Sequence, residues 1–78
     1  MDVADTNSEA AALLEEIAAE RVPDDKPRVR GLLCRSAVSL WLMAGDRDHA
    51  IAFAQQLMGQ LLPGFAADIR RLLGLKAT

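Results

Sequence analysis

The fold of this 78-residue chain is decided by residues 41–53, which read WLMAGDRDHAIAF. Gly45 and Asp46 separate two apolar runs in this stretch. A glycine readily adopts the left-handed conformation that ends a helix, and an aspartate after it can accept hydrogen bonds from the free amides of the next helix. Asp48 would then lie in a first helical turn, where negative charge is favourable. The stretch therefore predicts two helices joined by a tight turn.

Helical patterns extend in both directions from this turn. We expect helices over about residues 8–21, 26–44, 47–61 and 65–73, separated by breaks that contain proline or glycine. No segment shows the alternation with a period of two that marks a half-buried strand. The sequence therefore predicts an all-α protein, with three to four short helices in an antiparallel bundle or in stacked helical hairpins. We expect one domain over the whole chain, with a flexible arm at residues 1–7.

Each predicted helix carries apolar residues that we expect to face the core. Thr6 and Glu9 fit a capping box at the start of the first helix. Three arginines of the second helix, Arg28, Arg30 and Arg35, are expected on its outside. The apolar stripe of the first helix comprises Ala10, Leu13, Leu14, Ile17 and Ala18, and the apolar side of the third comprises Ala50, Ile51, Phe53, Ala54, Leu57, Met58 and Leu61. The expected inward residues are Val29, Leu33, Ala37, Leu40, Trp41 and Ala44 in the second helix, and Phe65, Ile69, Leu72 and Leu73 in the fourth.

The net charge of −2 conceals an uneven distribution. Residues 1–25 carry eight acidic groups and one basic group, a charge of −7, whereas residues 26–78 carry three acidic and eight basic groups, a charge of +5. Either the acidic first helix lies against the basic remainder, or the basic part faces an acidic partner. Nucleic acid is an unfavoured partner, because the sequence pI is about 5.2 and nucleic-acid-binding domains are usually strongly basic.

Residues 34–63 resemble one tetratricopeptide repeat, a helix–turn–helix unit of about 34 residues. The family has a Gly-Asp turn, then an Ala-Ile pair, then an aromatic residue, with another aromatic before the turn and a proline at the end. The matching positions in this chain are Trp41, Gly45, Asp46, Ala50, Ile51, Phe53 and Pro63. Val38, Ala54 and Leu57 depart from the pattern, and only one unit is present, so a plain helical hairpin is the alternative reading.

The resemblance implies a protein-binding scaffold and not an enzyme. In this family the first helix of the hairpin lines the binding groove. Small helical proteins with one such hairpin are similar to bacterial chaperones, co-chaperones and adaptors, which cover an apolar helix of a client protein. The groove positions that the resemblance implies here are Leu32, Arg35, Ser36, Ser39, Leu42 and Met43.

The second predicted helix is more apolar than a core-facing helix requires. The third adds Met58 beyond its inner face, and methionine packs adaptably at interaction surfaces. We therefore expect an apolar surface that is buried against a partner protein or in a homodimer. The predicted function is a non-enzymatic protein-interaction module, of the small chaperone or adaptor kind. The candidate partner-binding residues are Leu32, Arg35, Ser39, Leu42, Met43 and Met58.

No catalytic, cofactor-binding or metal site is expected. His49 is the only histidine and Cys34 the only cysteine, and we expect them at opposite ends of the hairpin. The five glycines are scattered singly and form no phosphate-binding loop. No uninterrupted apolar run is long enough for a membrane span. The acidic N-terminus is unlike a signal peptide, and a lone cysteine suits a reducing compartment, so we expect a cytoplasmic location.

Two other functions compete with the interaction module. A helix-turn-helix regulator would read bases with Gln55, Gln56 and Gln60 and bind phosphates with four arginines. A regulator that sequesters a transcription factor is suggested by the turn at residues 22–24, which follows an acidic helix. The four arginines of the first alternative are Arg28, Arg30, Arg70 and Arg71.

Overall fold

The computed structural model describes residues 3–75. Within them, α1 spans Val3–Glu20, α2 spans Pro27–Met43, α3 spans Arg47–Leu57 and α4 spans Pro63–Leu73, with a 3-10 turn at Met58–Gln60. Residues 3–75 include no strand. The prediction of an all-α protein is confirmed, and four is the observed number of helices in this part of the chain.

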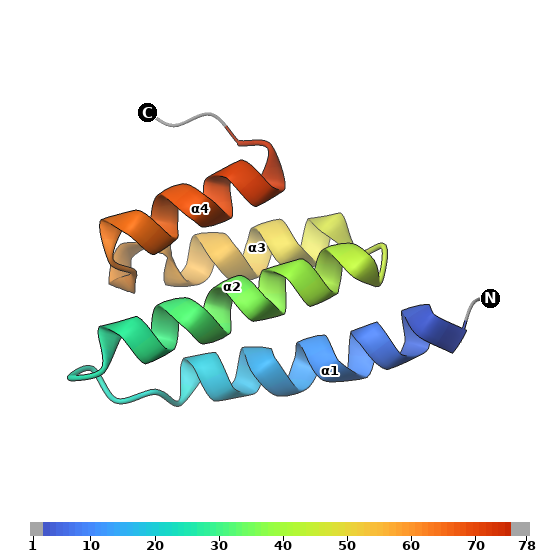
Figure 1. The fold of residues 1–78 in the computed structure, drawn as a ribbon, viewed down its shortest axis with the longest axis horizontal. Helices are drawn as coiled ribbons and strands as arrows, with labels where there is room; N and C mark the ends of the chain where they lie inside the picture. Colours follow the sequence, from blue (N-terminus) through green and yellow to red (C-terminus); the bar gives the residue numbers. More distant parts are fainter. Residues whose placement is uncertain (1–2, 76–78) are drawn as a thin grey trace.

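Consecutive helices run in opposite directions, and α2 is the central helix (Figure 1). It packs against each of the other three helices, with α1 along one side, α4 along the other and α3 behind. The molecule is a slab, with extents of 38 × 28 × 15 Å. So thin a slab leaves every helix with a face toward solvent.

The turn at residues 44–46 has the predicted chemistry. Gly45 adopts the left-handed conformation, with a φ of 82°, and the side chain of Asp46 accepts a hydrogen bond from the amide of His49 at 3.1 Å. Gly74, with a φ of 71°, ends α4 in the same way that Gly45 ends the turn after α2. The helical hairpin α2–α3 is therefore built by the local signals that predicted it.

The hydrophobic core lies where α2, α3 and α4 meet, with α1 adding small side chains. Most of the inward positions predicted for α2, α3 and α4 are buried or partly buried. Val29 and Leu72 are the exceptions, because both are largely exposed. The buried core residues are Ala12, Ala19, Cys34, Ala37, Val38, Trp41, Ala50, Phe53, Ala54, Leu57, Ile69 and Leu73.

The predicted inward stripe of α1 is wrong. The face that packs on α2 carries Ser8, Ala12 and Ala19, all of which are buried. The larger Leu13 and Leu14 are exposed on the opposite side, together with Ile17. The physical reason is close packing: an alanine face allows the two helix axes to approach, and the distance between packed helices depends on the side chains between them.

The start of α1 also differs from the prediction. The helix begins at Val3 and not near Ser8, so residues 3–7 are helical and do not form the expected arm. Residues 1–2 lie outside the described part of the chain. Thr6 lies within the helix, which removes the predicted capping box at Thr6 and Glu9. No proline or glycine stands between residues 3 and 8 to stop the helix earlier.

Arg30 is buried and does not lie on the outside as predicted. Its side chain is 7% exposed and donates hydrogen bonds to the carbonyls of Ala19 and Val22. It also pairs with Asp24 at 3.2 Å. The last carbonyls of a helix lack helical partners and carry the negative end of the helix dipole. The guanidinium group of Arg30 donates hydrogen bonds to carbonyls at this end of α1 and places a positive charge beside it.

Candidate protein-interaction surface

One side of α2 faces solvent along most of the helix. Leu32, Ser36, Ser39 and Met43 recur at helical spacing on this side, which we call the α2 face. Leu32 is 49% exposed and Met43 is 65% exposed, whereas the two serines are half-buried. The α2 face therefore presents two large apolar side chains with two small polar ones between them.

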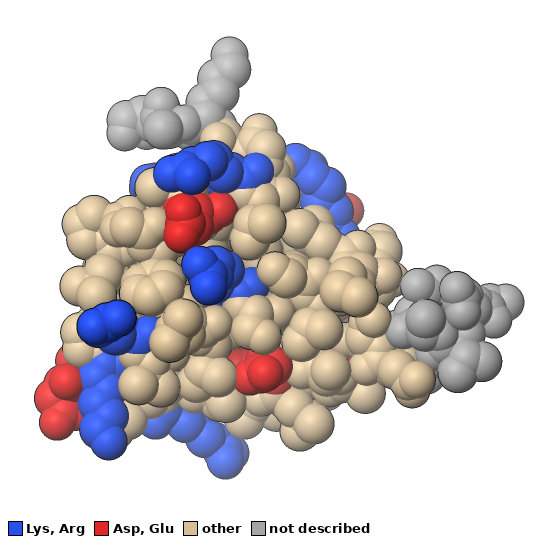
Figure 2. Space-filling view, in the orientation of Figure 1, with Lys and Arg blue, Asp and Glu red and all other residues tan. Residues whose placement is uncertain are grey.

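The α2 face lies between α1 and α4. On one side Ser36 Oγ donates a hydrogen bond of 3.4 Å to Glu15 of α1. On the other side Arg35 pairs with Asp68 of α4 at 3.4 Å. On the face that Figure 2 shows, lysine and arginine gather at the α1–α2 loop and over α4, and few charged side chains lie over the rest of α1 and α2. The two side-chain pairs hold the neighbouring helices and leave the middle of α2 open.

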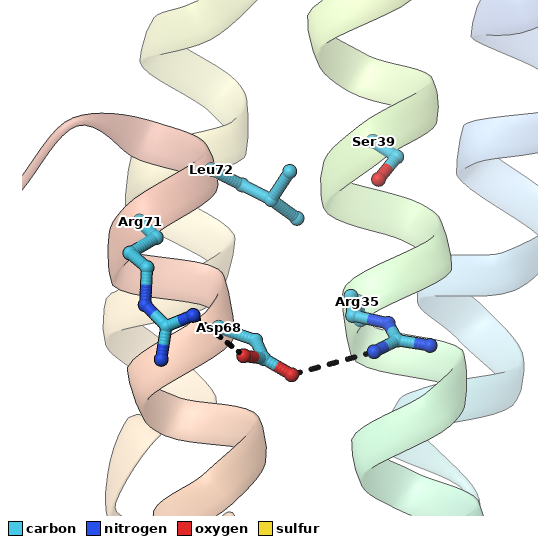
Figure 3. Close-up of a pocket in the computed structure, with 5 residues that line it drawn as sticks. All are labelled: Arg35, Ser39, Asp68, Arg71 and Leu72. Atoms are coloured by element: carbon cyan, nitrogen blue, oxygen red, sulfur yellow. Dashed lines mark hydrogen bonds and ion pairs between the residues drawn. The ribbon is translucent and has the colours of Figure 1, made fainter.

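A shallow groove of about 510 Å³ runs along the α4 side of the α2 face. In Figure 3, Leu72 projects from α4 toward α2, and Asp68 lies between the guanidinium groups of Arg35 and Arg71. Ser39 completes the lining of the groove from α2. Leu72 is the one apolar side chain in the lining, and the charged and polar groups around it resemble the polar rim of a protein interface.

The structure brings four of the six predicted partner-binding residues together. Leu32, Ser39 and Met43 lie on the α2 face, and Arg35 lines the groove beside it. The other two predicted residues, Leu42 and Met58, do not lie on the α2 face. Both are partly buried and pack against the hydrophobic core, Met58 from the 3-10 turn after α3.

A polar network joins three helices on another side of α2. The indole Nε1 of Trp41 donates a hydrogen bond of 3.0 Å to Oε1 of Glu16, and His49 Nε2 lies 2.7 Å from the same oxygen. The rings of Trp41 and His49 stack with their centroids 3.9 Å apart. Sequence reasoning missed this network, because no spacing pattern relates Glu16 of α1 to the α2–α3 turn. Its role is to hold α1 against the hairpin.

The titratable side chains show no arrangement suited to catalysis in the region that the structure covers. Cys34 is fully buried, and desolvation raises the pKa of its thiol from 9.0 to about 11, which keeps it protonated and unreactive at neutral pH. Between residues 3 and 75 there is no group of three or more histidine, cysteine, aspartate or glutamate side chains placed to hold a metal ion. No helix of this region is both long and apolar enough to cross a membrane.

One of the four arginines of the nucleic-acid alternative is engaged inside the fold. Gln55, Gln56 and Gln60 are exposed after or on α3, but Arg30 is buried against carbonyl groups and is not free to bind phosphate. The comparisons with known proteins add no assignment: no family model, no curated protein and no solved structure matches the chain. The tetratricopeptide resemblance therefore stays a prediction.

Proposed function

We propose that the chain is a non-enzymatic protein-interaction module, of the small chaperone or adaptor kind, that buries the α2 face against a partner protein or a second copy of itself. One observation carries the proposal. Helix α2 already supplies the centre of the core with its inner side, yet Leu32 is 49% exposed and Met43 is 65% exposed on its outer side. Exposed apolar patches with a polar rim mark interaction sites on soluble proteins.

The hairpin geometry supports a scaffold role. A tight Gly45 turn and the small, buried Ala50 after it are what a tetratricopeptide-like unit would need. In that family the first helix of the hairpin binds the client, and here the corresponding helix is α2. The single free cysteine, buried within the core, is consistent with the cytoplasmic location that belongs to this proposal.

The test changes the α2 face without changing the core. Met43→Asp and Leu32→Asp each place a carboxylate on the exposed face, and Ala52→Asp places one on the exposed side of α3 as the matched control. Native mass is measured by light scattering across a dilution series, and cross-linking identifies a partner that is then purified and titrated. Far-UV circular dichroism confirms that each variant is folded.

The expected result is that the two α2 variants weaken the dimer or the partner complex at least tenfold, because each buries an unpaired charge at the contact. Ala52→Asp should leave it unchanged. The proposal is wrong if native mass and partner affinity are the same in wild type, Met43→Asp and Leu32→Asp.

A further inference from the structure

Helix α1 has apolar residues on two opposite sides. Its inner side is the small-residue face that packs on α2. Its outer side carries Ala10, Leu13, Leu14 and Ile17, which we call the α1 stripe; the three larger side chains are 48%, 71% and 38% exposed. A helix that is apolar on both sides is normally covered on both.

Residues 3–75 leave the α1 stripe only partly covered. Helix α1 lies at the edge of the slab, and α2 is the one helix against which it packs extensively (Figure 1). Leu14 is largely exposed and Leu13 and Ile17 are partly exposed, while Ala12 and Ala19 are fully buried. This is the reverse of what core burial alone would select, since a leucine gains more than an alanine from burial. The outer side of α1 is therefore available to another molecule.

Negative charge borders the α1 stripe. Glu9 precedes Leu13 by one helical turn, and Glu20 follows Ile17 by one turn, so both lie at its edge. Both are exposed, and neither has an ion-pair partner between residues 7 and 75. Arg21, at the C-terminal end of α1, is the one cation at this border. By contrast, the two intervening glutamates turn inward, toward Ser36 and toward Trp41 and His49.

This charge pattern discriminates between possible occupants. A second copy docked through its own α1 stripe would bring two carboxylates and one guanidinium group from each chain to the same border, an excess of negative charge. A partner helix with an apolar stripe flanked by lysine or arginine would bury the leucines and neutralise Glu9 and Glu20 together. Complementary charge of this kind favours the correct partner and disfavours wrong ones.

We infer that the α1 stripe is a docking surface for a basic amphipathic α-helix of a partner protein. The helix would lie along α1 on the side opposite α2 and extend the layer by one helix. The large apolar side chains of the partner helix would contact Leu13, Leu14 and Ile17, as in other cases where an amphipathic helix binds an apolar surface. The surface is distinct from the α2 face, so the inference does not depend on the function proposed above.

The test uses two synthetic helical peptides with the same leucine–alanine stripe, one with lysine and one with glutamate at every polar position. Binding to the purified full chain is measured by fluorescence anisotropy at low and at physiological salt. The stripe variant is Leu13→Ser with Leu14→Ser. The matched control is Leu72→Ser, which removes an exposed leucine from α4 with no change of charge. Circular dichroism and thermal melting check the fold of each variant.

We expect the lysine peptide to bind at least tenfold more tightly than the glutamate peptide, and the stripe variant to lose at least tenfold in affinity. Leu72→Ser and Met43→Asp should bind as wild type does, which separates this surface from the α2 face. Glu9→Gln with Glu20→Gln should weaken binding and flatten its salt dependence.

Three results would overturn the inference. Equal binding of the two peptides would show a surface without charge preference. Undiminished binding by the stripe variant would show that the lysine peptide is attracted by overall charge. A native dimer that the stripe variant converts to monomer would assign the α1 stripe to a second copy of the chain.

Discussion

Replacing Gly31 with alanine tests the packing of α2 against α4. In an ordinary helix interior this change stabilises the fold by about 0.5–1 kcal/mol, because glycine has the greater backbone freedom when unfolded. Gly31 is not in an ordinary position. A Cβ atom there would lie 2.3 Å from Cδ2 and 2.5 Å from Cγ of Phe65. The side chain of Phe65 therefore rests on the bare backbone of Gly31.

The clash is larger than the gain in helix propensity. Carbon atoms in contact prefer about 3.5–4.0 Å, so the Phe65 ring would have to retreat by on the order of 1 Å or swing toward solvent. Cγ lies at the base of the ring, so rotation about the ring axis gives no relief. Overpacking of this kind costs about 1–3 kcal/mol, which leaves a net loss of about 1 kcal/mol. In a domain of this size that loss lowers Tm by about 4–8 °C.

Thermal unfolding followed by far-UV circular dichroism gives the measurement. Gly64→Ala is the matched control, since nothing lies within 4 Å of the Cβ it would add, and Tm should stay unchanged or rise slightly. In a Phe65→Ala background, Gly31→Ala should become stabilising, because the clash is gone. A rise in Tm for Gly31→Ala in the otherwise wild-type chain would refute the close approach of α2 and Phe65.

Three further perturbations probe the rest of the fold. Glu16→Ala removes the hydrogen-bond acceptor of the Trp41 indole and should lower the free energy of unfolding by about 1–3 kcal/mol in urea titrations, with a change in tryptophan fluorescence; an unaltered midpoint would contradict this. Burial raises the pKa of the Cys34 thiol from 9.0 to about 11, so the folded state holds its proton longer than the unfolded state. The free energy of unfolding should therefore be unaffected by this thiol below pH 9 and should fall by roughly 2–3 kcal/mol as the pH rises to 11. The decrease over this pH range should be smaller in Cys34→Ala. Arg30→Ala leaves the carbonyls of Ala19 in α1 and Val22 in the following loop without this donor and should destabilise the chain by more than about 1 kcal/mol, whereas exposed Arg28→Ala should change little; similar values for both would contradict the capping role.

The α2–α3 hairpin was predictable because its signals are local. A glycine with positive φ and an aspartate that caps the next helix act within four residues of each other, so the sequence contains the whole interaction. The same holds for the stop at Gly74. Gly45 is also the residue of the turn that adopts the left-handed conformation with the least steric cost.

The orientation of α1 was not predictable in this way. Both sides of α1 are apolar, and the choice between Leu13 with Leu14 and the alanine face depends on the shape of α2, which the sequence of α1 does not contain. The buried Arg30 and the network around Glu16 depend on the same long-range placement. For the candidate site, the resemblance and the apolar surplus proposed Leu32, Ser39 and Met43, which the structure places on one side of α2, together with Leu42 and Met58, which pack against the core.

The dependence of α1 on a single neighbour has a thermodynamic consequence. The helices α2, α3 and α4 contact one another and form a cooperative unit, whereas α1 adds to that unit through α2, with Glu16 as its link to α3. Opening of α1 alone would break its extensive contact with α2 and the Glu16 network while α2, α3 and α4 stay packed, so we expect it to require less free energy than unfolding of the whole chain. A ligand that binds α1 and prevents this opening would slow the hydrogen exchange of the α1 backbone amides. The exchange of amides inside α2, α3 and α4 would stay unchanged.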